Sequence, residues 1–227
     1  MQNKPTVNWK SWMILCLPAL LYVLLGYILR LILHTLPIGD DAVAGLCAVI
    51  LIVLSLPLYR AYGVKEKTQN FSPLSPILWL LSALAIGLCT GIFPGLQEAT
   101  LTTMLAILGY GIMAPIAEEV VYRGLILQYG EKKFGFWPAL MVSAILFAVA
   151  HVQPARMIAA LIFGILLGLL QNRYRTIWAP IIVHVTVNLL SFVLPTNIPL
   201  LCGVFGVVTL ITLSVYFVSP RHRNNDK

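Results

Sequence analysis

Long apolar segments, separated by short polar stretches, run through almost the whole chain. A helix that crosses a bilayer needs about 20 mostly apolar residues, and eight segments come close to that length. The fourth segment is long and the sixth is short. The pattern therefore predicts an all-α protein, a polytopic bundle of about eight transmembrane helices. The expected helices are approximately Trp12–Leu33, Ala42–Leu58, Leu74–Phe93, Leu101–Leu127, Phe134–Val152, Met157–Gln171, Ile177–Leu194 and Pro199–Val218.

The amino-acid composition agrees with this pattern. The chain has 227 residues, of which 59% are hydrophobic and 10% are charged. A soluble domain of ordinary composition has about 25% charged residues. No polar stretch of the chain is long enough to form a soluble domain. Residues 1–227 are therefore expected to form a single integral membrane domain that passes through the lipid bilayer several times.

The basic residues are distributed unevenly between the two ends of the predicted helices. They gather in the two tails and in every second gap, whereas the other gaps hold Asp40, Asp41 and Glu98, with Arg156 as the only base. Cytoplasmic loops of membrane proteins carry an excess of Lys and Arg, so both termini are predicted to be cytoplasmic. The net charge of +7 then reflects membrane topology and does not indicate nucleic-acid binding. The basic side holds Lys4, Lys10, Arg60, Lys65, Lys67, Lys132, Lys133, Arg173, Arg175, Arg221, Arg223 and Lys227.

A cluster of charges lies inside the fourth apolar segment. Glu118, Glu119 and Arg123 stand where the bilayer core is expected, and one charge at that depth costs about 2.5–3.5 kcal/mol. Glu119 and Arg123 share a helix face, as do Glu118 and Tyr122. The simplest division has Arg123 neutralise Glu119, which leaves Glu118 free to face a cavity. Pro115 can loosen the helix just upstream and free a carbonyl near the site. The alternative is a Glu–Arg pair that only locks helices together.

Later helices add polar groups that packing alone does not require. His151 ends the fifth segment, four residues after Phe147, and His184 shares a helix face with Asn188 in the seventh. These groups could converge on a water molecule, with Glu118 as base, a histidine to share the proton, and His184 with Asn188 as oxyanion donors. Glu118, His151 and His184 could instead ligate zinc or another divalent metal. The HExxH motif of zinc proteases is absent.

Three short motifs, in order on separate predicted helices, carry a family resemblance: Glu118-Glu119-x-x-x-Arg123, Phe147-x-x-x-His151 and His184-x-x-x-Asn188. Together they resemble the signature of the CPBP family, also called the Abi family, of CAAX-protease and bacteriocin-processing intramembrane proteases. The resemblance covers about Gly111 to Phe192. All seven motif positions are present, so the motifs give no sign of an inactive member. The motif-bearing core is expected at residues 101–194, and the helices of residues 1–100 are expected to surround it.

The resemblance implies a multi-helix membrane core and hydrolysis of a peptide bond. Eukaryotic and archaeal CAAX endopeptidases of this family cleave a C-terminal tripeptide after a prenylated cysteine. Carried over by motif, Glu118 is the water-activating base and His151 assists it. His184 and Asn188 are then the oxyanion pair, with Glu119 and Arg123 in support. Members have been described both as metalloproteases and as glutamate-dependent proteases, and the sequence leaves both open.

The depths of these residues disagree when they are counted from the expected helix ends. Glu118 lies about 9 residues, His184 about 7 and His151 about 17 residues from the cytoplasmic ends, a mismatch of roughly 12–15 Å. A later start of the fifth helix would reduce it, because Gly135 and Pro138 suit a delayed start. A tilted helix with a water cavity is the other solution.

Three functions are open on the sequence alone. The first is an intramembrane endopeptidase acting on a membrane-associated or lipidated peptide, with a cytoplasm-facing site in a bacterial plasma membrane. The second is a non-catalytic bacteriocin-immunity protein or a scaffold for a sensor kinase. The third is a transporter with a proton relay, although the chain shows no inverted repeat. The identity of the substrate and the oligomeric state are not indicated by the sequence.

Overall fold

The computed structural model describes residues 9–35, 40–62 and 101–193. All regular secondary structure within these ranges is helical, which confirms an all-α membrane bundle. The third and eighth expected helices, Leu74–Phe93 and Pro199–Val218, lie outside the described residues. The number of membrane spans, the cytoplasmic termini and the division into a core and surrounding helices therefore remain predictions.

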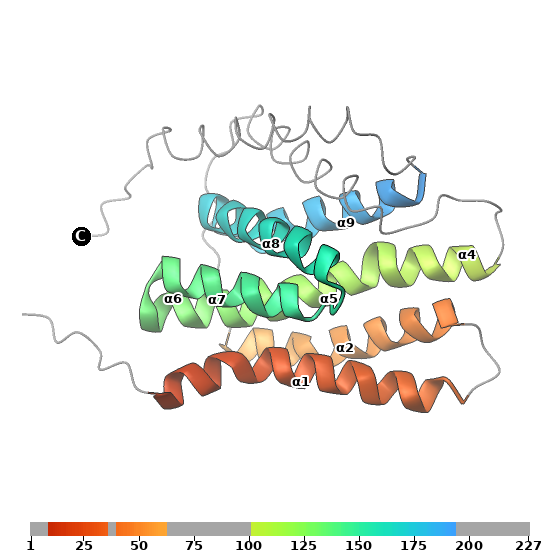
Figure 1. The fold of residues 1–227 in the computed structure, drawn as a ribbon, viewed down its shortest axis with the longest axis horizontal. Helices are drawn as coiled ribbons and strands as arrows, with labels where there is room; N and C mark the ends of the chain where they lie inside the picture. Colours follow the sequence, from red (N-terminus) through yellow and green to blue (C-terminus); the bar gives the residue numbers. More distant parts are fainter. Residues whose placement is uncertain (1–8, 36–39, 63–100, 194–227) are drawn as a thin grey trace, which may run out of the picture.

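One long helix, residues 101–134, forms the centre of the described bundle, and we call it the central helix. In Figure 1 it runs between α1 and α2 on one side and α8 and α9 on the other, with α7 folded back along it. Its consecutive parts are α4 (Leu101–Ala106), η1 (Ile107–Met113), α5 (Ala114–Glu119), η2 (Val120–Leu127) and α6 (Gln128–Phe134). The other helices are α1 (Trp9–Leu33), α2 (Asp40–Tyr62), α7 (Phe136–Val149), α8 (Pro154–Tyr174) and α9 (Trp178–Val193).

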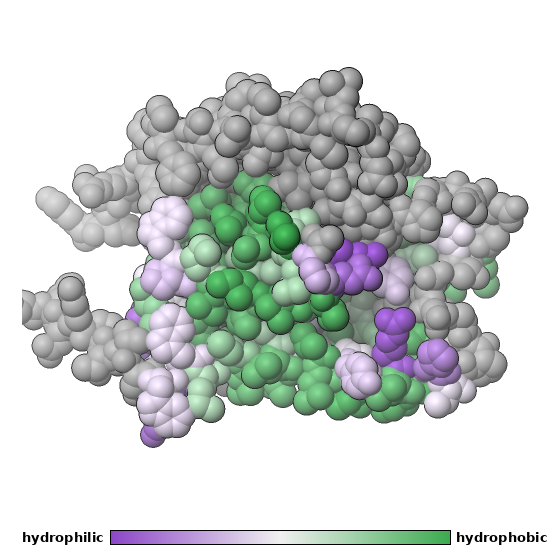
Figure 2. Space-filling view, in the orientation of Figure 1, coloured by the Kyte–Doolittle hydropathy of each residue, from purple (hydrophilic) through white to green (hydrophobic). Residues whose placement is uncertain are grey.

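The lipid-facing surface is broad and apolar. Within the described ranges, three helices are long and apolar enough to cross a membrane, namely Trp9–Leu33, Thr103–Phe134 and Arg156–Tyr174. Figure 2 shows hydrophobic side chains over much of the visible face of the described part. The outer face of α1 exposes leucine, isoleucine and methionine side chains along its length. Exposed apolar area on this scale suits contact with lipid.

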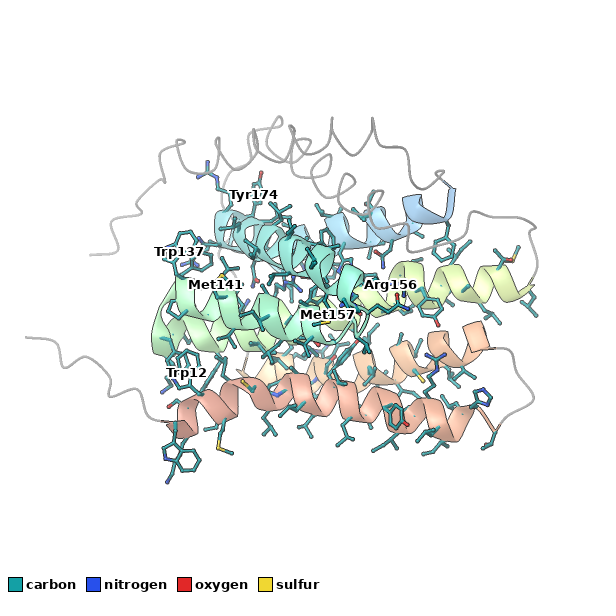
Figure 3. The ribbon with its side chains drawn as sticks, viewed as in Figure 1. Trp12, Trp137, Met141, Arg156, Met157 and Tyr174 are labelled. Carbon is teal, nitrogen blue, oxygen red and sulfur yellow. The ribbon has the colours of Figure 1, made fainter. Side chains whose placement is uncertain are left out.

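Aromatic side chains mark one end of the bundle. Trp12, Trp137 and Tyr174, which come from three different helices, lie toward the same end in Figure 3. Lys132 and Lys133 follow in the last turn of α6 at that end. Tryptophan and tyrosine collect at membrane–water interfaces, where each ring has one apolar and one wet side. The distribution therefore supports a membrane interface at this end.

A sharp turn joins the central helix to α7. The central helix continues to Phe134, past its predicted end at Leu127, and α7 begins at Phe136. Gly135 between them has a φ of 86°, a conformation that glycine adopts without steric penalty. One turn earlier, Gly130 lies so close to Ala139 that an added Cβ would be 2.8 Å from the Ala139 Cβ. The two helices therefore form a tight antiparallel hairpin.

This hairpin removes most of the depth mismatch. Glu118 is about 16 residues, roughly 24 Å, from the end of the central helix, and His151 is about 15 residues from the start of α7. The predicted late start of that helix is confirmed, but the correction of the end of the central helix from Leu127 to Phe134 contributes more. The polar run after Leu127 resembles a loop in sequence but continues the helix.

The depth of His184 in the bundle depends on where α9 begins along the central helix. Ile177, next to the first residue of α9, packs against Val120 and lies 3.0 Å from the position of a Cβ added to Gly124. The helix α9 therefore starts partway along the central helix and not at its end. His184, two turns into α9, consequently reaches the level of Glu119.

Candidate active site

A buried carboxylate lies at the centre of the site. Glu119 is fully buried, and its Oε1 is 3.1 Å from Arg123 Nη1 on the same helix and 2.8 Å from His184 Nδ1 on α9. The predicted Glu119–Arg123 pair is thus present. The bond from His184 was not predicted, because it joins helices that are 65 residues apart in sequence.

Arg123 connects this carboxylate to two further helices. Its Nη2 donates to the backbone carbonyl of Gly164 on α8 at 3.1 Å. Its guanidinium lies over the ring of Phe147 on α7, with Cζ 4.5 Å from the ring centroid. Arginine over an aromatic face is attracted by the negative face of the ring. The Glu119–Arg123 pair is therefore hydrogen-bonded to α8 and α9 and packed against an aromatic ring of α7.

Glu118 occupies a different environment from Glu119. Its side chain is 21% exposed, and its Oε2 lies 3.8 Å from His184 Nε2. The imidazole of His184 consequently stands between two carboxylates, with Nδ1 on the buried one and Nε2 facing the more accessible one. Glu119 is thus paired, as expected, and Glu118 is the more accessible carboxylate, whereas the roles expected of the two glutamates stay predictions.

His151 is held by the end of its own helix. It lies in the turn after α7, and its Nδ1 is 2.8 Å from the Phe147 carbonyl. A carbonyl oxygen only accepts, so Nδ1 carries the proton and Nε2 of the neutral ring is an acceptor. Phe147 contacts the rings of both His151 and His184, at centroid distances of 4.8 Å and 5.9 Å. One aromatic side chain therefore brings the second and third motifs together.

Asn188 lies one turn after His184 on α9. Its side-chain Nδ2 donates to the backbone carbonyl of Tyr110 on η1 at 2.9 Å. This bond orients the carboxamide and ties α9 to the central helix. The two residues that the resemblance assigns as an oxyanion pair are thus each held in a fixed orientation, His184 by a carboxylate and Asn188 by a backbone carbonyl.

Several side chains around the site were not identified from the sequence. Ser143 donates to the Tyr122 carbonyl at 2.7 Å, and Gln171 donates to the Arg123 carbonyl at 3.2 Å. Tyr122 is fully buried, and its hydroxyl has no hydrogen-bond partner among the described residues. The spacing of Tyr122 from Glu118 was the available signal for it. Ser143 and Gln171 carried none, since single polar residues on apolar helices usually satisfy local packing needs.

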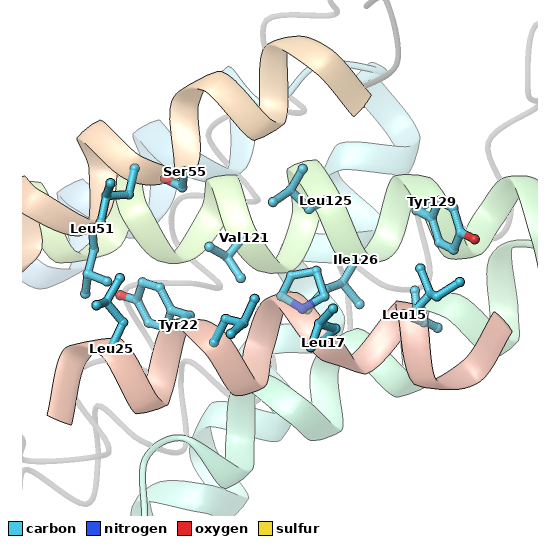
Figure 4. Close-up of a pocket in the computed structure, with 14 residues that line it drawn as sticks. Leu15, Leu17, Tyr22, Leu25, Leu51, Ser55, Val121, Leu125, Ile126 and Tyr129 are labelled. Carbon is cyan, nitrogen blue, oxygen red and sulfur yellow. The ribbon is translucent and has the colours of Figure 1, made fainter. Parts of the chain in front are cut away.

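An apolar groove approaches the site from the side of α1. It has a volume of about 550 Å³ and lies between α1, α2 and the central helix (Figure 4). Leucine side chains and the rings of Tyr22 and Tyr129 line much of it. Tyr22 stands toward one end, and its ring meets that of Tyr122 edge-on at 6.0 Å. Tyr122 lies one helical turn after Glu118 on the central helix, so the groove reaches the neighbourhood of the site.

The residues considered for a metal do not form a metal site. Across the described residues, no three His, Cys, Asp or Glu side chains are grouped closely enough to hold an ion. His184 uses Nδ1 on Glu119, and His151 uses Nδ1 on a backbone carbonyl. The set of Glu118, His151 and His184 therefore does not fit zinc or another divalent metal in this arrangement, and we derive no step through one.

Comparison with known proteins agrees with the geometry. Residues 100–190 match the model of a family described as "Type II CAAX prenyl endopeptidase Rce1-like". Over 84 residues the chain is 29% identical to "Putative membrane peptidase YdiL" of Bacillus subtilis (strain 168). The aligned region covers 37% of this chain and 34% of that protein. The match thus spans about a third of the length of this relative. No solved structure matches significantly. All seven motif residues fall within the family match, so residues 100–190 are similar to CAAX-type endopeptidases over the same part of the chain that carries the motif resemblance to the CPBP family of intramembrane proteases.

Proposed function

We propose that the protein is an intramembrane endopeptidase that hydrolyses a peptide bond in a membrane-associated or lipidated peptide or protein. The observation that carries this proposal is the position of His184 between Glu119 and Glu118. A structural ion pair needs only Glu119 and Arg123. It does not need a second carboxylate that is partly exposed and faces a histidine, but a hydrolytic site does.

Glu118 is the base in this proposal. It accepts a proton from a water molecule while the water oxygen attacks the carbonyl carbon of the scissile bond. The proton is then delivered to the nitrogen of the leaving amine, so one water is consumed for each bond cut. His151, whose Nε2 is left as an acceptor by the bond from Nδ1 to Phe147, assists in moving that proton.

The oxyanion that forms during attack needs donors fixed in advance. The Nδ1 bond to Glu119 holds the His184 ring so that Nε2 faces the Glu118 side of the site. In this proposal the ring carries a proton on each nitrogen during attack, because Nε2 of a neutral ring with its proton on Nδ1 would be an acceptor and not a donor. The bond to Tyr110 holds the amide of Asn188 one turn further along α9. Groups that are preoriented in a site of low dielectric stabilise developing charge without reorganising, and removal of one such donor typically lowers kcat by about 10²–10³-fold.

The groove supports a substrate that is at least partly apolar. Its lining is dominated by aliphatic side chains, and it ends at Tyr22 beside Tyr122. An apolar segment or a lipid group of the substrate could occupy it while the scissile bond reaches Glu118. In this proposal the end marked by Trp12, Trp137 and the α6 lysines faces the cytoplasm of a bacterial cell.

The proposal is tested with the full chain reconstituted in liposomes. The probes are a quenched fluorescent peptide that ends in an S-farnesyl cysteine and three residues, the same peptide without the lipid, and a single-span helical peptide. Glu118→Gln and His184→Ala are expected to lower turnover of any cleaved probe by at least about 100-fold. The matched control is Glu131→Gln, which breaks a pair with Arg175 on the exposed surface and should retain turnover.

Full turnover in Glu118→Gln would reject the catalytic role. Turnover in the wild type should also survive a chelator, because Glu118, His151 and His184 do not gather into a three-ligand group in this arrangement. Loss with chelator and recovery with zinc would instead support the metal-dependent mechanism.

The competing function is a non-catalytic immunity protein or regulatory scaffold. It is favoured by the Glu119–Arg123–His184 network, which would be useful simply for joining the central helix, α8 and α9. In that role Glu118→Gln should retain both abundance and phenotype in cells, whereas the endopeptidase role requires the phenotype to be lost while abundance is retained.

A further inference from the structure

In the π-helical segment η1, the carbonyl of Tyr110 has no backbone amide opposite it in the five-residue register. In η1 the amides donate five residues back, and the last of them is Ala114 N–H to the Gly109 carbonyl. The next amide in this register belongs to position 115, which is proline and has no N–H. The Tyr110 carbonyl, opposite that missing donor, instead accepts the side-chain amide of Asn188 at 2.9 Å. The sequence-based expectation that Pro115 frees a carbonyl near the site agrees with this arrangement.

Close approach of α9 makes this bond possible. A Cβ added at Gly111, next to Tyr110, would lie 2.9 Å from Leu189 Cδ2 and 3.5 Å from Phe192 Cε2. Glycine at this position therefore lets α9 pack directly on η1, so that Asn188 reaches the backbone of the neighbouring helix. Three features therefore favour the contact between Asn188 and the Tyr110 carbonyl: the π-helical register of η1, the missing amide at Pro115 and the small residue Gly111.

The second π-helical segment, η2, also has a carbonyl that is bonded by a side chain, although its last amide donates in a different register. At the end of η2 the Gln128 amide donates to the Leu125 carbonyl, three residues back. The Arg123 carbonyl accepts the side-chain amide of Gln171 from α8 at 3.2 Å. A side-chain amide from a neighbouring helix thus bonds a backbone carbonyl in both π-helical segments, but no proline follows η2, so the missing amide is a feature of η1 alone.

We propose that Pro115 is a positioning residue for the hydrolysis proposed above, acting through Asn188. Position 115 has no N–H to compete for the Tyr110 carbonyl, so that oxygen accepts from Asn188. Because a carbonyl oxygen only accepts, it orients the carboxamide with its NH₂ group toward Tyr110. A carboxamide has a donor end and an acceptor end that are nearly equal in size. A competing donor at the Tyr110 carbonyl would weaken the hold on the nitrogen end, and an amide oxygen turned toward the developing oxyanion repels the charge that the nitrogen would stabilise.

The test restores the missing amide with Pro115→Ala, measured alone and together with Asn188→Ala in the reconstituted full chain. A new N–H at position 115 competes with Asn188 for the Tyr110 carbonyl. We expect Pro115→Ala to lower kcat by about 10-fold or more with KM changed less than about 2-fold, and not to lower Tm, since alanine suits a helix better than proline. In the Asn188→Ala background, Pro115→Ala should have no further effect on kcat. The matched control is Pro57→Ala, which restores an amide in the interior of α2 at an exposed position and should leave kcat unchanged.

Two results would overturn the inference. One is wild-type kcat in Pro115→Ala. The other is an additive loss in the double variant, which would mean that Pro115 acts on Glu118 or on general packing; this readout holds even if Pro115→Ala lowers Tm. Glu118→Gln separates the two proposals, because an active Glu118→Gln enzyme rejects the proposed function itself. An inactive Glu118→Gln enzyme with a fully active Pro115→Ala enzyme rejects only the positioning role.

Discussion

At the scale of single residues, the site contains two buried charges of opposite sign that lie in contact. Glu119 and Arg123 are both fully buried, and breaking such a pair by removing one partner typically costs about 3–5 kcal/mol. His184 Nδ1 and the Gly164 carbonyl contribute further hydrogen bonds to the pair. These bonds satisfy several of the polar atoms that burial removes from water. The other acidic side chain, Glu118, is 21% exposed and therefore the more accessible of the two carboxylates.

Tyr122→Phe gives a prediction at this scale. The Tyr122 hydroxyl is buried without a hydrogen-bond partner among the described residues, and such a group costs about 1–3 kcal/mol. Its removal is therefore expected to leave the protein equally stable or more stable, measured by the thermal midpoint in detergent. Ser143→Ala is the contrasting variant, since it removes a bond to the Tyr122 carbonyl and should lower the midpoint. A clear fall in the midpoint for Tyr122→Phe would show that the hydroxyl has a stabilising partner.

Local spacing explains which contacts of the site could be predicted. Glu119 and Arg123 are one helical turn apart, so their pairing follows from helix geometry alone. The bond from His184 to Glu119 depends instead on where α9 starts along the central helix. That depth is set by Ile177 packing beside Gly124, a contact between distant parts of the chain that no spacing reveals.

At the scale of elements, close helix contacts position the charged residues. An added Cβ at Gly164 would be 3.2 Å from Ala144 Cα, which is backbone and cannot move away as a flexible side chain would. Gly164 also supplies the carbonyl that Arg123 bonds. The α7–α8 contact and the orientation of Arg123 are therefore linked through one glycine.

Gly164→Ala should separate α7 from α8. We expect it to lower stability by about 1–3 kcal/mol, the usual range for overpacking, and to lower turnover because Arg123 loses its carbonyl partner. Chemical denaturation and the peptide assay measure the two effects. Gly26→Ala on α1 is the control, because its new Cβ would meet only the Leu51 side chain at an ordinary 3.6 Å. Equal stability of the two variants would contradict the packing argument.

Helix ends were the least predictable feature at this scale. The run from Gln128 to Lys133 is polar and contains Gly130, which together favour a loop. It is helical because Gly130 packs on Ala139 and Glu131 pairs with Arg175 at 2.9 Å. Both contacts join this run to other parts of the chain, so the local sequence predicted a loop where the structure has a helix. The sharp turn at Gly135, by contrast, follows from glycine alone.

At the scale of the whole molecule, the site lies near the middle of a long helix. Glu118 is about 24 Å from the end at Phe134 and roughly 26 Å from Leu101. A charged cluster at that depth needs shielding from lipid, and α1, α2, α7, α8 and α9 surround it. The groove beside α1 has an apolar lining and includes Tyr22, whose ring meets that of Tyr122 in the central helix.

Orientation in the membrane is the last prediction, and it decides which compartment the aromatic end faces. In a cysteine-free background, Lys132→Cys at the exposed end of α6 should react with an impermeant maleimide only in inverted vesicles. Thr35→Cys, exposed after the far end of α1, should react only in intact cells, because a helix of 25 residues is about 38 Å long and separates the two positions by a bilayer. The reverse pattern would place the lysine end outside, and the positive-inside argument for this chain would then be wrong.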